Sequence, residues 1–189
     1  MSNYYVPPFT ILVDTAEQHP FEFQGMKADS KDGYKPILIQ WNHNLKRANL
    51  GRHPDSYGDY SLDGMHRVIG IERKSVADLQ STVLEFKDGR RDRFEKEMSN
   101  LQSIRYGFVV VEGSFQECCT TCRDTTMKTS AQNNKILHRS ILSYQINYDM
   151  VRWVFCETRR FSEITTFRLL EKCYKHWNDV DARQQEIPF

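Results

Sequence analysis

The chain has 189 residues, of which 39% are hydrophobic and 27% are charged, and its formal net charge is +1. This length supports one globular domain with a core, and the charge excludes a global basic field as the basis of nucleic-acid binding, although a local patch or metal ions can supply positive charge. No apolar run reaches the roughly 18 residues of a membrane span. The first residues lack the basic and apolar regions of a signal peptide, so we expect a cytoplasmic protein without a membrane span.

The apolar pattern predicts alternating strands and helices. In chain order these are strands at 9–13 and 36–41, a hairpin of strands at 57–62 and 67–72 across the Asp63-Gly64 turn, helices at 75–85 and 88–102, a strand at 106–112, a helix at 134–147, a strand at 151–156 and a helix at 160–177. Polar residues dominate 42–57 and 113–133, which are expected to be loops. This order indicates an α/β fold. We expect one domain over residues 1–177 and a polar tail over 178–189.

The most informative segment is the predicted hairpin, whose strands carry Asp59, Glu72 and Lys74. Glu72 and Lys74 are two residues apart near the end of a mostly apolar strand, so their side chains point to the same face. Asp59 faces the same point if the strands pair in register. Two carboxylates and an ammonium at one point are costly, and a divalent cation would remove the repulsion. The pattern suits metal-assisted phosphodiester hydrolysis, although Glu-x-Lys is also common on solvated strands.

A helix is predicted to begin directly after this strand. Ser75 suits its N-cap, and Asp78 stands where a capping box places a carboxylate. Asp78 therefore has two open roles, as a capping residue and as part of a catalytic site. The helix start would lie close to Lys74, where its positive dipole end could help to bind phosphate.

This segment resembles the XPF-type structure-specific endonucleases, whose signature is Gly-Asp…Glu-Arg-Lys-x-x-x-Asp. The matching residues are Gly58, Asp59, Glu72, Arg73, Lys74 and Asp78. Upstream, Asp14 and Glu17 match two acidic residues that follow the family's first strand, but Ala16 stands where an arginine is expected. Downstream, Arg93 and Glu97 match a helix of the family that carries an arginine and, four residues later, a glutamine or glutamate.

The resemblance implies a restriction-endonuclease-like fold, with a central mixed sheet flanked by helices, and a Mg²⁺- or Mn²⁺-dependent DNA endonuclease of repair or recombination. The expected catalytic residues are Asp59, Glu72, Lys74 and Asp78. The expected metal ligands are Asp14, Asp59, Glu72 and the backbone carbonyl of Arg73. Lys74 is expected to orient the attacking water or help to deprotonate it. Glu17 and Glu97 are expected to support the ligands from behind.

Basic residues near these motifs are candidates for contacts with DNA phosphates. They are Arg73, Arg90, Arg93, Arg123 and Lys128. Arg73 has the alternative of a structural ion pair with Glu97 or Asp78. Arg123 and Lys128 lie in the expected loop 113–133, which has the alternative of a solvated insertion without a DNA contact.

The cysteines give no strong metal signal. Cys118, Cys119 and Cys122 cluster in the expected loop, but a structural zinc site needs a second pair of ligands, and no such pair stands out. We therefore expect a polar loop with incidental thiols, which stay reduced in a chain without an export signal.

Partners follow from the resemblance and from the C-terminal residues. The family's tandem helix-hairpin-helix motifs have no counterpart in the 12 residues after Trp177, so branched or flap DNA is expected only by analogy. A homodimer through the last two helices is a further expectation. Gln184, Ile187 and Phe189 resemble peptides that dock on bacterial or phage sliding clamps, and the alternative is a tail packed on its own domain.

Two other functions stay open. The chain could be a nuclease subunit that is active only beside a partner, or a catalytically silent module that binds DNA junctions. The presence of Asp59, Glu72 and Lys74 argues against the silent module.

Overall fold

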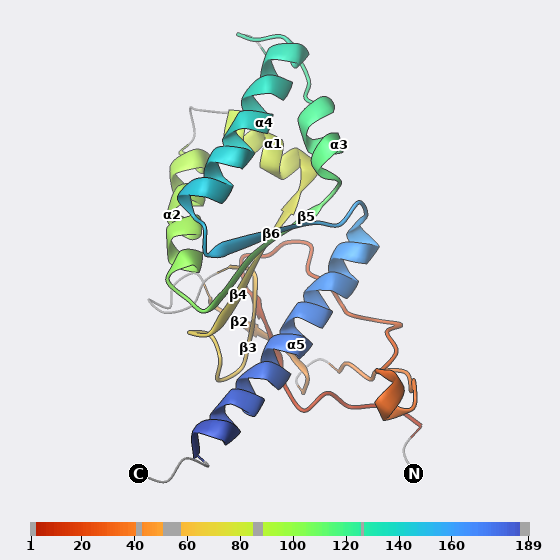
Figure 1. Cartoon of the computed structure of the whole chain (residues 1–189). Helices are drawn as coiled ribbons and strands as arrows, with labels where there is room; N and C mark the ends of the chain where they lie inside the picture. The colour runs from red at the N-terminus through yellow and green to blue at the C-terminus, as the bar shows by residue number, and fades with distance from the viewer. Residues whose placement is uncertain (1–2, 41–42, 51–57, 85–88, 126, 186–189) are drawn as a thin grey trace.

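A computed structural model describes residues 3–40, 43–50, 58–84, 89–125 and 127–185. Its centre is a six-stranded sheet in the order β2-β1-β3-β4-β5-β6, which Figure 1 shows with helices on both sides. The strands are β1 (Ile11–Asp14), β2 (Leu45–Ala48), β3 (Tyr60–Leu62), β4 (Ile69–Ser75), β5 (Tyr106–Glu112) and β6 (Val151–Phe155). β3 pairs antiparallel with both β1 and β4, whereas the other neighbours are parallel, so the sheet is mixed as expected.

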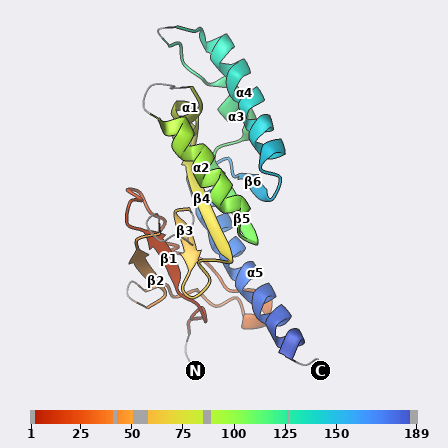
Figure 2. The same ribbon diagram turned by 90° about the vertical axis from the view of Figure 1, so that its left-hand side faces the viewer.

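Five α-helices and one short 3-10 helix complete the described part of the chain. They are η1 (Ser30–Asp32), α1 (Val76–Leu84), α2 (Arg90–Gln102), α3 (Phe115–Thr120), α4 (Ser130–Asn147) and α5 (Arg159–Gln185). In Figures 1 and 2, α1 to α4 gather at one end and on one side of the sheet, while α5 crosses the other side. This arrangement confirms the α/β architecture.

Strand β5 shows why the sheet is covered on both faces. Phe108 and Val110 pack into one core with Phe167 of α5, while Val109 and Val111 pack into a second core with α1, α2 and α4. Successive strand residues point to opposite faces, so a strand buried on both faces reads as a continuous apolar run. The run Phe-Val-Val-Val in this strand has that origin.

The prediction of a strand at 36–41 is wrong. In the described residues of that segment only isolated bridges occur, between Tyr5 and Ile37 and between Lys27 and Pro36. The strand β2 lies instead inside the expected loop 42–57. The residues of β2 carry little strand signal because only Leu45 is fully buried. In the segment 36–41, Pro36 has no N–H group that could donate to a strand ladder.

The expected loop 113–133 is partly helical, which corrects that prediction. Ser114 accepts a hydrogen bond from the N–H of Glu117 and caps α3. Thr129 and Gln132 form a complete capping box, which starts α4 earlier than expected. The Ser-x-x-Glu and Thr-x-x-Gln spacings are readable in the sequence as capping signals.

The last helix is longer than expected. α5 continues past residue 177 to Gln185, so the proposed boundary between domain and tail falls inside a helix. None of the helices in the described ranges is long and apolar enough to cross a membrane.

Candidate active site

The hairpin of β3 and β4 places Asp59 and Glu72 next to each other. Tyr60 pairs with Ile71, and the N–H of Asp59 donates a 2.8 Å hydrogen bond to the carbonyl of Ile71. Directly opposite residues of an antiparallel pair share a face, so Asp59 and Glu72 point to the same side. Glu72 is buried, with 5% of its surface exposed. The register that the sequence required is therefore confirmed.

Gly58 permits this close approach. Its φ is +85°, and a Cβ atom at this position would lie 2.6 Å from the carbonyl oxygen of Ile71. Only glycine adopts such a conformation at no steric cost, and any side chain would push the strands apart. The glycine of the motif thus fixes where Asp59 stands.

Lys74 lies at the centre of the acidic residues. Its Nζ is 2.8 Å from Oε1 of Glu72, 3.4 Å from Oδ2 of Asp78 and 3.8 Å from Oε2 of Glu97. Its ammonium also stands 5.1 Å from the ring centroid of Phe94 on α2. One cation therefore joins the end of β4 to the first turn of α1 and to α2.

The pKa values at this point reflect crowded carboxylates. Burial and then the charge of Glu72 raise the pKa of Asp59 well above its usual value. Burial and the charge of Glu72 likewise raise the pKa of Glu97 to about 8. Burial of the ammonium opposes its charge, but Glu72, Glu97 and Asp78 outweigh it and raise the pKa of Lys74. The neighbouring carboxylates therefore favour the protonated form of Lys74.

Arg73 points to the opposite face of the sheet. Its Nε and Nη2 donate hydrogen bonds of 2.7 Å and 3.1 Å to the two carboxylate oxygens of Glu112, and its Nη1 bonds Glu17 at 3.2 Å. Its side chain is 11% exposed. This geometry favours the structural role over a phosphate contact, and the partners are Glu17 and Glu112 in place of the expected Glu97 or Asp78.

Arg159 and the ring of Phe21 complete the cluster around Arg73, and no motif in the sequence indicated either of them. Arg159 at the start of α5 donates a 2.7 Å hydrogen bond to Oε1 of Glu112. The guanidinium groups of Arg73 and Arg159 lie 5.6 Å and 5.0 Å from the ring centroid of Phe21. The cluster holds Glu17 against Arg73 on this face of the sheet, and the expected role of Glu17 in supporting the metal ligands stays a prediction.

Asp14 and Asp78 occupy the edges of the site. The N–H of Asp14 donates to the carbonyl of Asp59, but its Oδ1 accepts from the N–H of Leu50 at 3.2 Å. The N–H of Asp78 donates to Oγ of Ser75 at 3.1 Å, which confirms Ser75 as the cap of α1. Asp78 thus lies in the first turn of α1 and contacts Lys74 with its carboxylate, and its part in a catalytic site stays a prediction.

The expected DNA-contacting residues differ in their surroundings. Arg90 donates to Oγ of Ser81 at 3.1 Å, and Lys128 lies half-buried in the turn before α4. Arg93 is exposed on α2, one turn before Glu97. Arg123 is exposed beside α1, where it lines a groove of about 590 Å³ together with Val76 and Gln80. Of these four residues, Arg93 and Arg123 are the exposed ones.

The acidic residues at the end of β4 are the candidate position for a divalent ion. Within the described ranges, no group of three or more His, Cys, Asp or Glu side chains could hold a metal ion by itself. Asp14, Asp59 and Glu72 are therefore not assembled into such a group, and their role as metal ligands stays a prediction. Oε2 of Glu97 is buried without a hydrogen-bond partner, and Asp59 and Glu72 crowd each other, so added positive charge would relieve both features. Cys118 of α3 and Cys122, which follows this helix, are free and buried in the second core.

The expected clamp-binding residues lie at the end of the described chain. Gln184 belongs to α5, while Ile187 and Phe189 lie outside the described residues. The clamp interaction stays a prediction.

The fold and the arrangement at β3 and β4 define an XPF-type nuclease domain with a restriction-endonuclease-like sheet. The sequence model of the ERCC4 domain matches residues 26–168, which is more than half of the chain, and the chain therefore belongs to the ERCC4 domain family. The structure is similar to XPF from Aeropyrum pernix, with a TM-score of 0.54 and 18% sequence identity over 93% of this chain and 70% of that chain. At this identity the likeness shows the fold. No curated protein matches the sequence.

Proposed function

We propose that this ERCC4-family nuclease domain is a metal-dependent DNA endonuclease that hydrolyses phosphodiester bonds. The observation that carries the proposal is the contact of Lys74 with Glu72, 2.8 Å long, beside Asp59 on the same face of the sheet. A lysine–glutamate ion pair with a structural role alone does not need a second carboxylate beside it. The raised pKa of Asp59 is typical of functional sites.

Each residue of the site has a role in this proposal. Asp59 and Glu72 hold the metal ion together with the backbone carbonyl of Arg73, and Asp14 is the candidate for a second ion. Lys74, protonated, orients the attacking water and offsets the charge of the phosphate. Asp78 and Glu97 keep Lys74 in place through contacts of 3.4 Å and 3.8 Å. Arg93 and Arg123 are the proposed phosphate contacts, because guanidinium groups suit bidentate binding of phosphate.

Mg²⁺ or Mn²⁺ is the proposed cofactor. Oxygen ligands favour these ions over zinc. When bound, such an ion supplies Lewis-acid stabilisation of charge on the phosphate and lowers the pKa of a bound water.

The proposal for the substrate is branched or flap DNA. It rests on family analogy, and the groove beside α1 that Arg123 lines is a candidate place for a strand. The purified protein should be assayed with labelled single-stranded, duplex, flap and four-way DNA in Mg²⁺, Mn²⁺ or EDTA. Cleavage with metal only, and strongest on flap or four-way DNA, is the expected result.

The same assay decides among the other functions. Binding without cleavage in either metal would contradict the enzyme and support the junction-binding module. Cleavage that appears only after cell extract is added would support a partner-dependent subunit. Soaking a crystal in Mn²⁺ and finding no anomalous peak between Asp59 and Glu72 would contradict the proposed metal ligands.

Two partner interactions also remain proposals. A homodimer would use α4 and α5, and Leu142 and Ile146 are exposed large side chains four residues apart on α4. Sedimentation of the wild type and of Ile146→Glu tests it, because a monomeric wild type would contradict the dimer.

The clamp interaction is tested by removal of residues 186–189, which leaves α5 whole and should abolish binding to a sliding clamp.

A further inference from the structure

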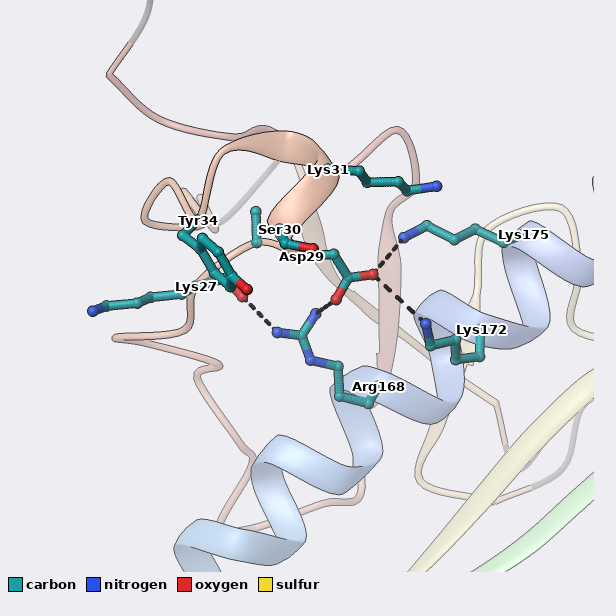
Figure 3. Close-up of a pocket in the computed structure, with 9 residues that line it drawn as sticks. Lys27, Asp29, Ser30, Lys31, Tyr34, Arg168, Lys172 and Lys175 are labelled. Carbon is teal, nitrogen blue, oxygen red and sulfur yellow. Dashed lines mark hydrogen bonds and ion pairs between the residues drawn. The ribbon is translucent and has the colours of Figure 1, made fainter.

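A basic pocket lies between α5 and the N-terminal segment that contains η1, as Figure 3 shows. Its volume is about 660 Å³. Five cationic side chains and a single carboxylate line it: Lys27, Lys31, Arg168, Lys172, Lys175 and Asp29. For a chain whose formal net charge is only +1, this is a strong local excess of positive charge.

The buried side chain of Glu171 holds two of the cations of α5 in place. Glu171 is fully buried, and its two carboxylate oxygens accept from Arg168 at 2.7 Å and from Lys175 at 3.1 Å. Arg168 also donates to the backbone carbonyl of Lys27 on the opposite wall. The buried glutamate therefore fixes the positions of two cations whose remaining surface faces the pocket.

Asp29 alone faces the cations from the opposite wall. Its carboxylate lies 3.4 Å from Lys175, 3.6 Å from Lys172 and 3.6 Å from Arg168, as the dashed lines in Figure 3 mark. Although burial opposes it, these neighbours lower the pKa of Asp29, led by the hydrogen bond from Lys175. Asp29 and Glu171 together supply two carboxylates against these three cations, so one positive charge of α5 is left over, and Lys27 and Lys31 add two more on the other wall. This net positive charge is a favourable setting for an anion.

Two other cations of the pocket, Lys27 and Lys31, come from the N-terminal segment. Both are exposed, and no ion pair engages either of them among the residues that the structure describes. In Figure 3 both side chains extend away from Asp29 and flank the pocket. Like-charged side chains around one pocket repel each other, and an anionic ligand would relieve that repulsion.

An exposed aromatic ring stands beside these cations. Tyr34 is 65% exposed and lines the pocket. Its φ is +52°, and it directly follows Gly33, which ends η1 in the left-handed conformation. The tight turn therefore presents the ring to solvent rather than to the core. Aromatic rings next to a basic groove are the combination on which single-stranded nucleic acids stack their bases.

The cations of the pocket are spread over more than one phosphate, because Arg168, Lys172 and Lys175 meet at Asp29, whereas Lys27 and Lys31 extend away from it in Figure 3. Arg168, Lys172 and Lys175 follow one face of α5, and seven residues of helix span about 10 Å. Phosphates of one strand follow each other about every 3.4 Å along the axis of a duplex but lie farther apart along the backbone itself, so this row reaches about two of them. Lysine provides flexible point charges that can follow a backbone without fixing a single geometry.

We propose that this pocket binds a strand of single-stranded nucleic acid, with the backbone along α5 and a base stacked on Tyr34. The pocket packs on the core that contains Phe167, whereas Lys74 contacts Phe94 on the other face of the sheet. The site is thus separate from the cleavage site, and it holds a strand whether or not the protein cuts DNA.

The test is binding of a fluorescent oligothymidine of about 15 nucleotides in EDTA, where no cleavage occurs and the carboxylates of Asp59 and Glu72 disfavour DNA at the other face. The double variant Lys27→Glu/Lys31→Glu is expected to weaken binding about tenfold or more. It should also reduce the slope of log K against log salt by about 0.7 for each phosphate that the variant no longer neutralises. Tyr34→Ala is expected to weaken binding about fivefold with little change in the slope.

The matched control is Lys135→Glu/Arg139→Glu, which makes the same change in net charge at two exposed positions of α4. It should bind nearly as the wild type does. Equal weakening in both double variants would show a general charge effect and overturn the proposal, as would unchanged binding in Lys27→Glu/Lys31→Glu. Competition by a mononucleotide at the concentration at which the oligomer competes would show a small-molecule site and also overturn it.

Discussion

The backbone N–H of Arg73 donates a 2.8 Å hydrogen bond to Oδ2 of Asp59. This bond ties the acidic residue that precedes β3 to the middle residue of Glu-Arg-Lys on β4. The side chain of Arg73 is fixed on the other face by Glu112, so its backbone cannot move without breaking a buried ion pair. The arginine of the motif therefore positions Asp59 without pointing toward it.

Glu72→Gln and Lys74→Ala should each reduce cleavage by at least about 100-fold, because each removes a group placed at the reacting phosphate. Rates in Mg²⁺ on the best DNA substrate check this. Far-ultraviolet circular dichroism and the binding of DNA in EDTA are the controls for folding. A variant that cuts at the wild-type rate would remove that residue from the proposed site.

Arg73→Met should lower the free energy of unfolding by about 3–5 kcal/mol, because Glu17 and Glu112 would remain buried without this cation. Urea denaturation measures the decrease. Arg159→Met is the matched control: its side chain is 45% exposed and Glu112 would keep Arg73, so about 1 kcal/mol or less is expected. If Arg73→Met left stability unchanged and weakened DNA binding instead, the phosphate contact would be the correct role.

Gly58→Ala should destabilise the protein and slow cleavage, because the new methyl group would collide with the carbonyl of Ile71 next to Asp59. Gly64→Ala is the control, since Gly64 also has a positive φ, of +78°, but no atom within 4 Å of the added Cβ. Gly64→Ala should cost only the left-handed strain, about 1–2 kcal/mol, and keep its cleavage rate. Equal effects of the two substitutions on rate would contradict the role assigned to Gly58.

The metal-free protein should lose stability as the pH rises from about 4.5 to about 8. The pKa of Glu97 is raised from 4.5 to about 8, so between these values the folded state holds a proton that the unfolded state has released. Unfolding then releases protons, and the free energy of unfolding falls with rising pH. Urea titrations in EDTA across this window measure the fall, and Glu97→Gln should flatten it. An equal slope in the variant would contradict the assignment.

Mg²⁺ should raise the melting temperature more at pH 8 than at pH 5, because carboxylates must lose their protons to bind it. Thermal unfolding with and without the ion provides the measurement. Glu72→Gln should remove most of the increase while Lys135→Gln, far from the motif in sequence and exposed on α4, should keep it. An increase of the same size in Glu72→Gln would place the ion elsewhere.

The hairpin of Asp59 and Glu72 was predictable because its signals are local. The alternating apolar pattern sets the face of each side chain, and Asp63-Gly64 limits where the strands turn. β2 was missed because an edge strand with one buried residue carries almost no periodicity. α3 was missed although its cap is readable, because the polar composition of 113–133 outweighed the Ser-x-x-Glu spacing.

The sequence by itself determined the residues of the candidate site, two carboxylates and a lysine on one face of a hairpin, and the family to which the motif belongs. Only the tertiary structure decided the partners of Arg73, because Glu112 and Glu17 lie 39 and 56 residues away in the chain. It also decided that Asp29 and the cations of α5 share a pocket, across a separation of about 140 residues. Local patterns fix which way a side chain points, but charges distant in sequence meet only once the sheet and helices have packed.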